Sequence, residues 1–168
     1  MKKWIVLGLF FSVTGALWAH THLGKTVTTN LPGGIEVSVS YSMTPAPEID
    51  PAAAPVDTFI NPWAPLLRVS QPVKLGSADV AMGMYTLGLI KSGSGEWALA
   101  LHPGRLVRKE APVGPQVIRL DSMYSSSEGT ADHLVVDFSL GKGKLEDKVV
   151  VTFHWGSIYL AAELAGKG

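Results

Sequence analysis

A tight turn between two apolar runs constrains the fold of this chain most. Residues 92–95 read Ser-Gly-Ser-Gly, and both flanking runs alternate between two faces. The side chains that share a face are Tyr85, Leu87 and Leu89 before the turn and Trp97, Leu99 and Leu101 after it. A period of two is typical of a β-strand, and Gly and Ser supply the backbone conformations of a short connection. This stretch therefore predicts an antiparallel hairpin.

An earlier hairpin is predicted just upstream. Residues 73–75 and 80–82 are short strand candidates, and residues 76–79 (Gly-Ser-Ala-Asp) have the composition of the turn between them. Two hairpins in succession predict a β-meander at the centre of the chain.

The period of two recurs on both sides of this centre. The strand candidates are residues 35–42, 66–69, 117–123, 134–140 and 149–155. Gly, Pro and Ser separate these short runs, and no convincing helix follows residue 19. The predicted fold class is all-β, an antiparallel β-sandwich or a partly open barrel. We expect the large aromatic side chains of the inward faces to share one core: Tyr85, Trp97, Phe138, Phe153 and Trp155.

Residues 43–65 interrupt the alternation. Six of the eleven prolines lie in this stretch, and proline is excluded from helix interiors and from central strands. We therefore predict a long extended loop that Phe59, Ile60 and Trp63 hold against the domain. Loops of this length are mobile or carry function. Trp63 is the one tryptophan that we consider for stacking on a ligand.

The N-terminus has the parts of a secretory signal peptide. Lys2 and Lys3 precede an apolar run that ends at Ala19 and is shorter than the roughly 20 residues of a membrane span. Cleavage after Ala19 would leave a single domain of residues 20–168, and cleavage after Ala16 is the alternative. We therefore expect an exported, soluble protein, periplasmic or extracellular, with no membrane span in the mature chain.

The amino-acid composition excludes some classes of binding partner. The chain has no cysteine, so it has neither a disulfide framework nor a lipid-attachment thiol. Residues 1–19 hold two of the 14 Lys and Arg and none of the 14 acidic residues, so the mature chain carries two net negative charges. Nucleic-acid binding needs a basic stripe, and the sequence has none. The expected partner is an unknown small molecule or an envelope protein, and not a nucleic acid.

The order of these segments resembles a family of secreted bacterial proteins, domain of unknown function 2911. That family has a V-x-V-x-Y strand, a loop Trp, a V-x-I-x-G…L-x-A-G-x-Y-x-L segment, an E-W-x-V-x-x-N strand and a closing L-x-L-x-W strand. The counterparts in this chain lie within residues 25–164. Residues 37–41 correspond to the first strand, Trp63 to the loop Trp, residues 96–102 to the E-W strand and residues 151–155 to the closing strand. The middle segment is matched by Val73, Leu75, Gly76, Val80, Gly83, Tyr85 and Leu87. The resemblance implies a β fold and export, but no activity. Where the family has the polar run R-T-G-A-N-E-A-T, this chain has Ala-Pro-Leu-Leu-Arg-Val-Ser at residues 64–70, so a site formed there is not carried over.

Cleavage after Ala19 would place His20, Thr21 and His22 at the start of the mature chain. The free α-amine, two backbone nitrogens and the His22 imidazole can surround Cu(II) or Ni(II) in a square plane, which these ions favour with nitrogen ligands. An N-terminal His20 could also chelate through its amine and its own ring. The alternative is a frayed terminus with two incidental histidines. His20 and His22 are the candidate metal ligands, and copper is the candidate cofactor.

The remaining histidines and serines form no recognisable catalytic pattern. His102, His133 and His154 lack metal-ligand spacing, and residues 92–95 lack the G-x-S-x-G sequence of a nucleophile elbow. The alternation predicts that His154 is solvated or at an interface. The first hypothesis is a binding or structural module of unknown ligand, without an evident catalytic constellation and without a cofactor, which favours a non-enzyme but leaves an enzyme open. The alternatives are a copper-binding protein that uses the two N-terminal histidines, and a hydrolase with an unrecognised site between the proline-rich loop and the central hairpins.

We expect the chain cleaved after Ala19 to bind one Cu(II), with an affinity that falls as the pH falls because the ligand nitrogens must lose protons. Titration of the exported protein with Cu(II) should give one site that His22→Ala abolishes and His133→Ala leaves intact. Mass spectrometry of the same sample fixes its first residue. A mature chain that starts at Leu17 places the two histidines mid-chain and contradicts the copper hypothesis.

Overall fold

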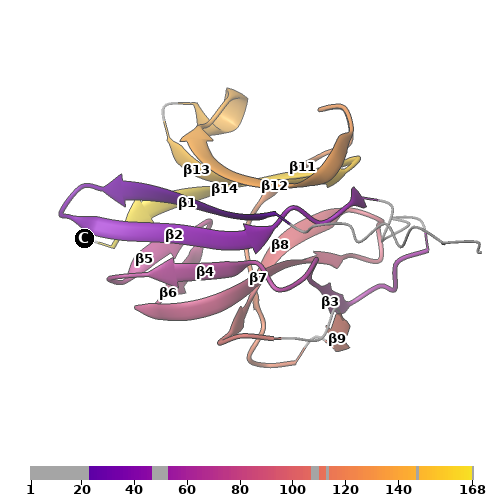
Figure 1. Cartoon of the computed structure of the whole chain (residues 1–168), viewed down its shortest axis with the longest axis horizontal. Coiled ribbons are helices and arrows are strands. Elements are labelled where there is room, and N and C mark those ends of the chain that lie inside the picture. Colours follow the sequence, from indigo (N-terminus) through magenta and orange to yellow (C-terminus); the bar gives the residue numbers. More distant parts are fainter. Residues whose placement is uncertain (1–22, 47–52, 107–109, 113, 147, 168) are drawn as a thin grey trace, which may run out of the picture.

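The computed structural model describes residues 23–46, 53–106, 110–112, 114–146 and 148–167 (Figure 1). Two antiparallel β-sheets pack against each other over a shared core, so the predicted all-β sandwich is confirmed. The predicted signal peptide, residues 1–19, and the candidate ligands His20 and His22 lie outside the described residues. Within the described ranges, no helix is long and apolar enough to cross a membrane.

The first sheet has eight strands in the order β1-β2-β4-β7-β3-β9, with β8 on the other edge of β7 and β10 beyond β8. β3 and β4 lie end to end along one edge of β7, because both pair with it opposite β8. The strands are β1 (Gly24–Leu31), β2 (Ile35–Ser42), β3 (Thr58–Ile60), β4 (Leu66–Val69), β7 (Gly83–Lys91), β8 (Trp97–Pro103), β9 (Glu110–Pro112) and β10 (Ile118–Arg119).

The second sheet has six strands in the order β12-β13-β14-β5-β6, and β11 also pairs with β14. A 3₁₀ turn, η2 (Gly143–Leu145), connects β12 to β13 and rises from the outer side of this sheet (Figure 1). The strands are β5 (Val73–Leu75), β6 (Ala78–Val80), β11 (Met123–Ser125), β12 (Ala131–Leu140), β13 (Val149–Gly156) and β14 (Ile158–Gly166).

The core lies between the two sheets and contains the predicted aromatic cluster. The fully or nearly buried members are Tyr85, Trp97, Phe153 and Trp155, and a half-buried Phe138 packs against them. The indole N–H of Trp155 donates a hydrogen bond to the Pro45 carbonyl at 3.2 Å, which satisfies its polar atom. The period-2 pattern therefore identified the inward faces correctly.

The predicted hairpin turn at residues 92–95 is confirmed, and a second hairpin turn lies at residues 156–157. Lys91 pairs with Trp97 across the first, and Trp155 pairs with Ile158 across the second. Gly156 has φ 59°, a conformation that favours glycine in such a two-residue turn.

The predicted central meander is wrong, because the two central hairpins lie in different sheets. β5 and β6 belong to the second sheet, whereas β7 and β8 belong to the first. The upstream turn is also shorter than predicted, since Leu75 already pairs with Ala78. Alternation tells which face of a strand is buried, but it carries no information about the neighbouring strand.

The predicted strand at residues 117–123 is likewise divided between the sheets. β10 pairs with β8 in the first sheet, and β11 pairs with β14 in the second. Between them, the buried Leu120 donates its backbone N–H to the Leu99 carbonyl at 2.8 Å. Residues 120–122 therefore form a crossover from one sheet to the other.

The proline-rich loop contains a short strand that the prolines concealed. β3 places Phe59 and Ile60 in buried positions, as predicted, and Trp63 is 49% exposed. Phe59 packs with Ile90 on the side of the first sheet away from the main core. This contact requires glycine at Gly88, where a Cβ atom would lie 2.5 Å from the Ile60 carbonyl oxygen and 2.6 Å from the Phe59 ring.

Candidate binding groove on the second sheet

The outer face of the second sheet carries three cross-strand rows of side chains. The inward positions of β12, β13 and β14 fill the core, so the alternate positions face outward. The strand register defines the rows as Val135, His154, Tyr159 and Ser125; Asp137, Thr152, Ala161 and Met123; and Ser139, Val150 and Glu163. In the central row, β13 and β14 carry the small side chains of Thr152 and Ala161. In the rows on either side, the same two strands carry larger side chains: His154 and Tyr159 in one row, and Val150 and Glu163 in the other.

This arrangement produces two adjoining hollows of about 370 Å³ and 390 Å³. Three residues line both hollows: Met123 of β11, Leu145 of η2 and Ala161 of β14. β14 therefore forms the floor, and the η2 turn and β11 lie on either side of it. We call the two hollows together the outer groove. Buried Val150 and Ala161 at its base show that this face is partly shielded from solvent although it lies outside the core.

The first hollow contains His154 and Tyr159 on neighbouring strands. Their rings meet edge to face, with centroids 5.5 Å apart and an interplanar angle of 87°. The Nε2 atom of His154 is buried and has no hydrogen-bond partner among the described residues. Burial raises the pKa of the Tyr159 hydroxyl above its usual value of 10.0, and the negative charge of Glu128 adds to this effect. The first hollow is therefore lined by an aromatic wall, the rings of His154 and Tyr159, and the Nε2 atom of His154 lacks a hydrogen-bond partner.

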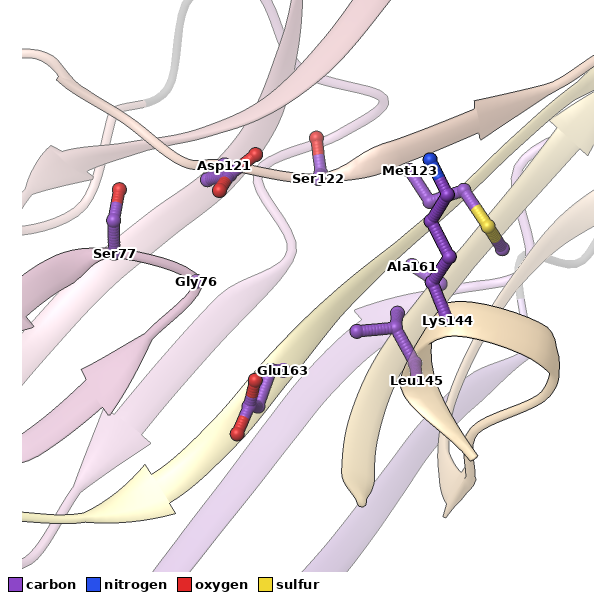
Figure 2. Close-up of a pocket in the computed structure, with 9 residues that line it drawn as sticks. All are labelled: Gly76, Ser77, Asp121, Ser122, Met123, Lys144, Leu145, Ala161 and Glu163. Carbon is purple, nitrogen blue, oxygen red and sulfur yellow. The ribbon is translucent and has the colours of Figure 1, made fainter. Parts of the chain in front are cut away.

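The second hollow lies where β14 changes its pairing partner. β11 pairs with β14 through Ala161, and β5 takes over at Leu164. Between these ladders, the Gly76 N–H donates to the Glu163 carbonyl at 2.7 Å. Figure 2 shows Met123, Lys144 and Leu145 at one end of the hollow and Ser77 and Asp121 at the other, with Glu163 below.

The charged groups of this second hollow are only partly available to a ligand, because Glu163 already forms an ion pair. The Glu163 carboxylate accepts a hydrogen bond from the Lys148 amine at 2.6 Å, in a partly exposed ion pair. Such pairs contribute at most about 1 kcal/mol to stability because solvent screens them. The second hollow combines charged and hydroxyl groups with the apolar Met123 and Leu145, whereas the His154–Tyr159 ring pair and the unpartnered nitrogen lie in the first hollow.

The histidines considered from the sequence do not converge on a metal site. His102 contacts Gln116 Nε2 at 3.2 Å on the first sheet, whereas His133 and His154 lie on the second. In the part of the chain that the structure describes, no group of three or more His, Asp or Glu residues is arranged to hold a metal ion. His20 and His22 lie outside that part, so the copper hypothesis stays a prediction.

Ser92 and Ser94 lie in an exposed hairpin turn, where their hydroxyls are 2.7 Å apart. The turn connects two strands, so it lacks the strand-to-helix geometry of a nucleophile elbow.

Sequence reasoning did not single out His154 as a candidate site residue. The alternation placed it on the outer face correctly and predicted that it is solvated or at an interface, but it did not indicate that the Nε2 atom is buried without a partner. A signal was present in the sequence. The two-residue turn at Gly156 and Ser157 fixes the register of the hairpin and sets His154 opposite Tyr159.

The chain matches no family model, no curated protein and no solved structure. The resemblance to domain of unknown function 2911 therefore stays a prediction.

Proposed function

We propose that this protein is an exported binding module whose outer groove holds a small ligand with an apolar body and one hydrogen-bonding group. The observation that carries the proposal is the buried, unpartnered Nε2 atom of His154 in a hollow with an aromatic wall. Buried polar atoms without partners are rare in folded proteins, and each calls for an explanation. A ligand that bonds to this nitrogen would supply the missing partner. Small-molecule sites are usually hollows that combine apolar side chains with polar groups that orient the ligand, and this hollow has Val135 and Leu140 beside Asp137 and Lys142.

The polar neighbours of His154 support binding rather than catalysis. Thr152 donates its hydroxyl to the Asp137 carbonyl at 3.2 Å, and the Asp137 carboxylate accepts the Phe138 N–H at 2.8 Å. Both residues are thus engaged with the strand backbone. A nucleophile activated by a base requires a direct hydrogen bond between the two, whereas the Thr152 hydroxyl and the Asp137 carboxylate each bond to a backbone atom. Export rests on the N-terminal sequence, with its basic start and short apolar run.

Replacing His154 with phenylalanine separates binding from stability. We expect His154→Phe to raise the free energy of unfolding by about 1 kcal/mol, because a buried unsatisfied nitrogen is removed while the ring is kept. The same change should weaken binding of the probe p-cresol, an aromatic ring with one hydroxyl, at least tenfold. Thermal unfolding and an NMR titration with p-cresol measure the two effects.

The matched control is His133→Phe, which changes an exposed histidine on the neighbouring strand β12. It should leave p-cresol binding unchanged and alter the unfolding free energy by no more than about 0.5 kcal/mol. Toluene, which lacks the hydroxyl, should bind both wild type and His154→Phe weakly and equally. Unchanged p-cresol affinity in His154→Phe would exclude the outer groove as the binding site.

A further inference from the structure

The segment from Pro62 to Pro65 holds two consecutive residues in an unfavourable backbone conformation. Trp63 has φ 60° and Ala64 has φ 49°, and neither is a glycine. Left-handed conformations are energetically unfavourable at residues other than glycine, and they cluster at functional sites. The surrounding structure must therefore impose this turn.

Two buried polar side chains hold the turn in place. Asn61 is 1% exposed, and its Oδ1 atom accepts the Ala64 N–H at 2.7 Å. Thr44 is fully buried, and its hydroxyl lies within hydrogen-bond distance of two acceptors, the Ser42 carbonyl at 3.2 Å and the Pro62 carbonyl at 3.5 Å. On the other side of the turn, the Pro65 carbonyl accepts the Leu87 N–H of strand β7 at 2.8 Å. The result of this anchoring is a rigid display of Trp63 at the surface.

Trp63 borders a cleft of about 290 Å³ on the outer face of the first sheet, which we call the Trp63 cleft. Hydroxyl groups line its strand side, where Thr26 Oγ1 and Ser40 Oγ lie 2.9 Å apart. Lys25 and Arg105, both exposed, add two positive charges. Among the described residues, no acidic side chain lines this cleft.

We propose that the Trp63 cleft binds an acidic saccharide. The flat apolar face of an indole suits the C–H face of a sugar ring, and the indole's rigidity keeps the entropy cost of binding low. Serine and threonine hydroxyls both donate and accept, as sugar hydroxyls do. Arg105 and Lys25 match a carboxylate, since hydrogen bonds between ionised partners are about twice as strong as neutral ones. This site is on the opposite sheet from the outer groove and is independent of it.

The test uses trigalacturonate and its fully methyl-esterified form, which differ in the charge of the carboxyl groups. Trp97 and Trp155 are each 3% exposed, so quenching of tryptophan fluorescence by acrylamide reports mainly on Trp63 in the exported chain. We expect trigalacturonate to protect Trp63 from acrylamide and the ester to bind at least tenfold more weakly. Arg105→Gln should weaken trigalacturonate binding at least threefold and leave the ester unaffected.

Calorimetric titration of Trp63→Ala should show trigalacturonate affinity reduced at least tenfold, with melting close to wild type because the side chain is half exposed. Lys144→Gln, a charge change on the other sheet, should retain full affinity, and so should His154→Phe. Three results would overturn the proposal: no protection by trigalacturonate, undiminished binding to Trp63→Ala, or equal binding of acid and ester. Displacement of trigalacturonate by equimolar acetate would show simple anion binding and overturn it as well.

Discussion

Replacing Trp97 with alanine is expected to lower the free energy of unfolding by about 3–5 kcal/mol. Trp97 lies at the start of β8, is 3% exposed and belongs to the core between the two sheets. Its removal would leave a cavity in a region where Tyr85 and Trp155 also pack, and surrounding side chains fill such cavities only partly. Urea unfolding followed by circular dichroism measures the change.

Met82→Ala is the control for this substitution, because Met82 is 67% exposed. Its effect should stay within about 0.5 kcal/mol. If Trp97→Ala also falls within that range, the assignment of Trp97 to the inter-sheet core is wrong.

Gly76→Ala is expected to cost about 3 kcal/mol or more, although it adds a single methyl group. Gly76 has φ 58°, a conformation that costs other residues about 1–2 kcal/mol. A Cβ atom there would also overlap the backbone of Asp121 in the crossover between the sheets. Because backbone cannot rotate away, the β5–β6 turn would have to separate from the crossover. The second hollow of the outer groove would change shape with it.

Gly33→Ala separates the cost of the positive φ angle from the cost of the overlap with the Asp121 backbone. Gly33 has φ 85°, but nothing lies within 4 Å of the position that its Cβ would occupy. Its cost should therefore be the conformational part alone, about 1 kcal/mol. Equal destabilisation by Gly76→Ala and Gly33→Ala in parallel thermal unfolding would show that the contact with Asp121 is not tight.

Much of the fold could be predicted from the sequence because strands reveal their buried faces through alternation. Residues 66–69 were predicted as a strand and form β4 with the same bounds. The face shared by Trp97, Leu99 and Leu101 is buried against the core as expected. Local turn chemistry at residues 92–95 was sufficient to predict the β7–β8 hairpin.

The partners of each strand could not be predicted in the same way. Strand pairing depends on contacts between residues far apart in the chain, such as Leu75 with Leu164. Residues 117–123 have the length of a single strand, yet they cross from one sheet to the other at residues 120–122. Strand β3 was missed since its neighbouring prolines argued against a strand, and tertiary contacts with β7 and β9 outweigh that local preference.

The two candidate sites differ in how far the sequence alone indicated them. Trp63 was considered for ligand stacking because prolines surround it, and the structure leaves it half exposed beside the Trp63 cleft. His154 was placed on the correct face, but its buried Nε2 atom depends on the three-dimensional outer groove. Burial of one atom on an outer face depends on side chains from neighbouring strands and turns, which the linear pattern of one strand does not encode.

The most direct test of the binding proposal is amide chemical-shift mapping of the wild-type protein during titration with p-cresol. The largest shifts should occur at Val135 and Thr152 and around Tyr159, on three neighbouring strands of the second sheet. The His154 side-chain Nε2 resonance should move in step with them as it gains a hydrogen-bond partner. Shifts confined to the first sheet, with an unperturbed His154 resonance, would contradict the outer groove as the binding site.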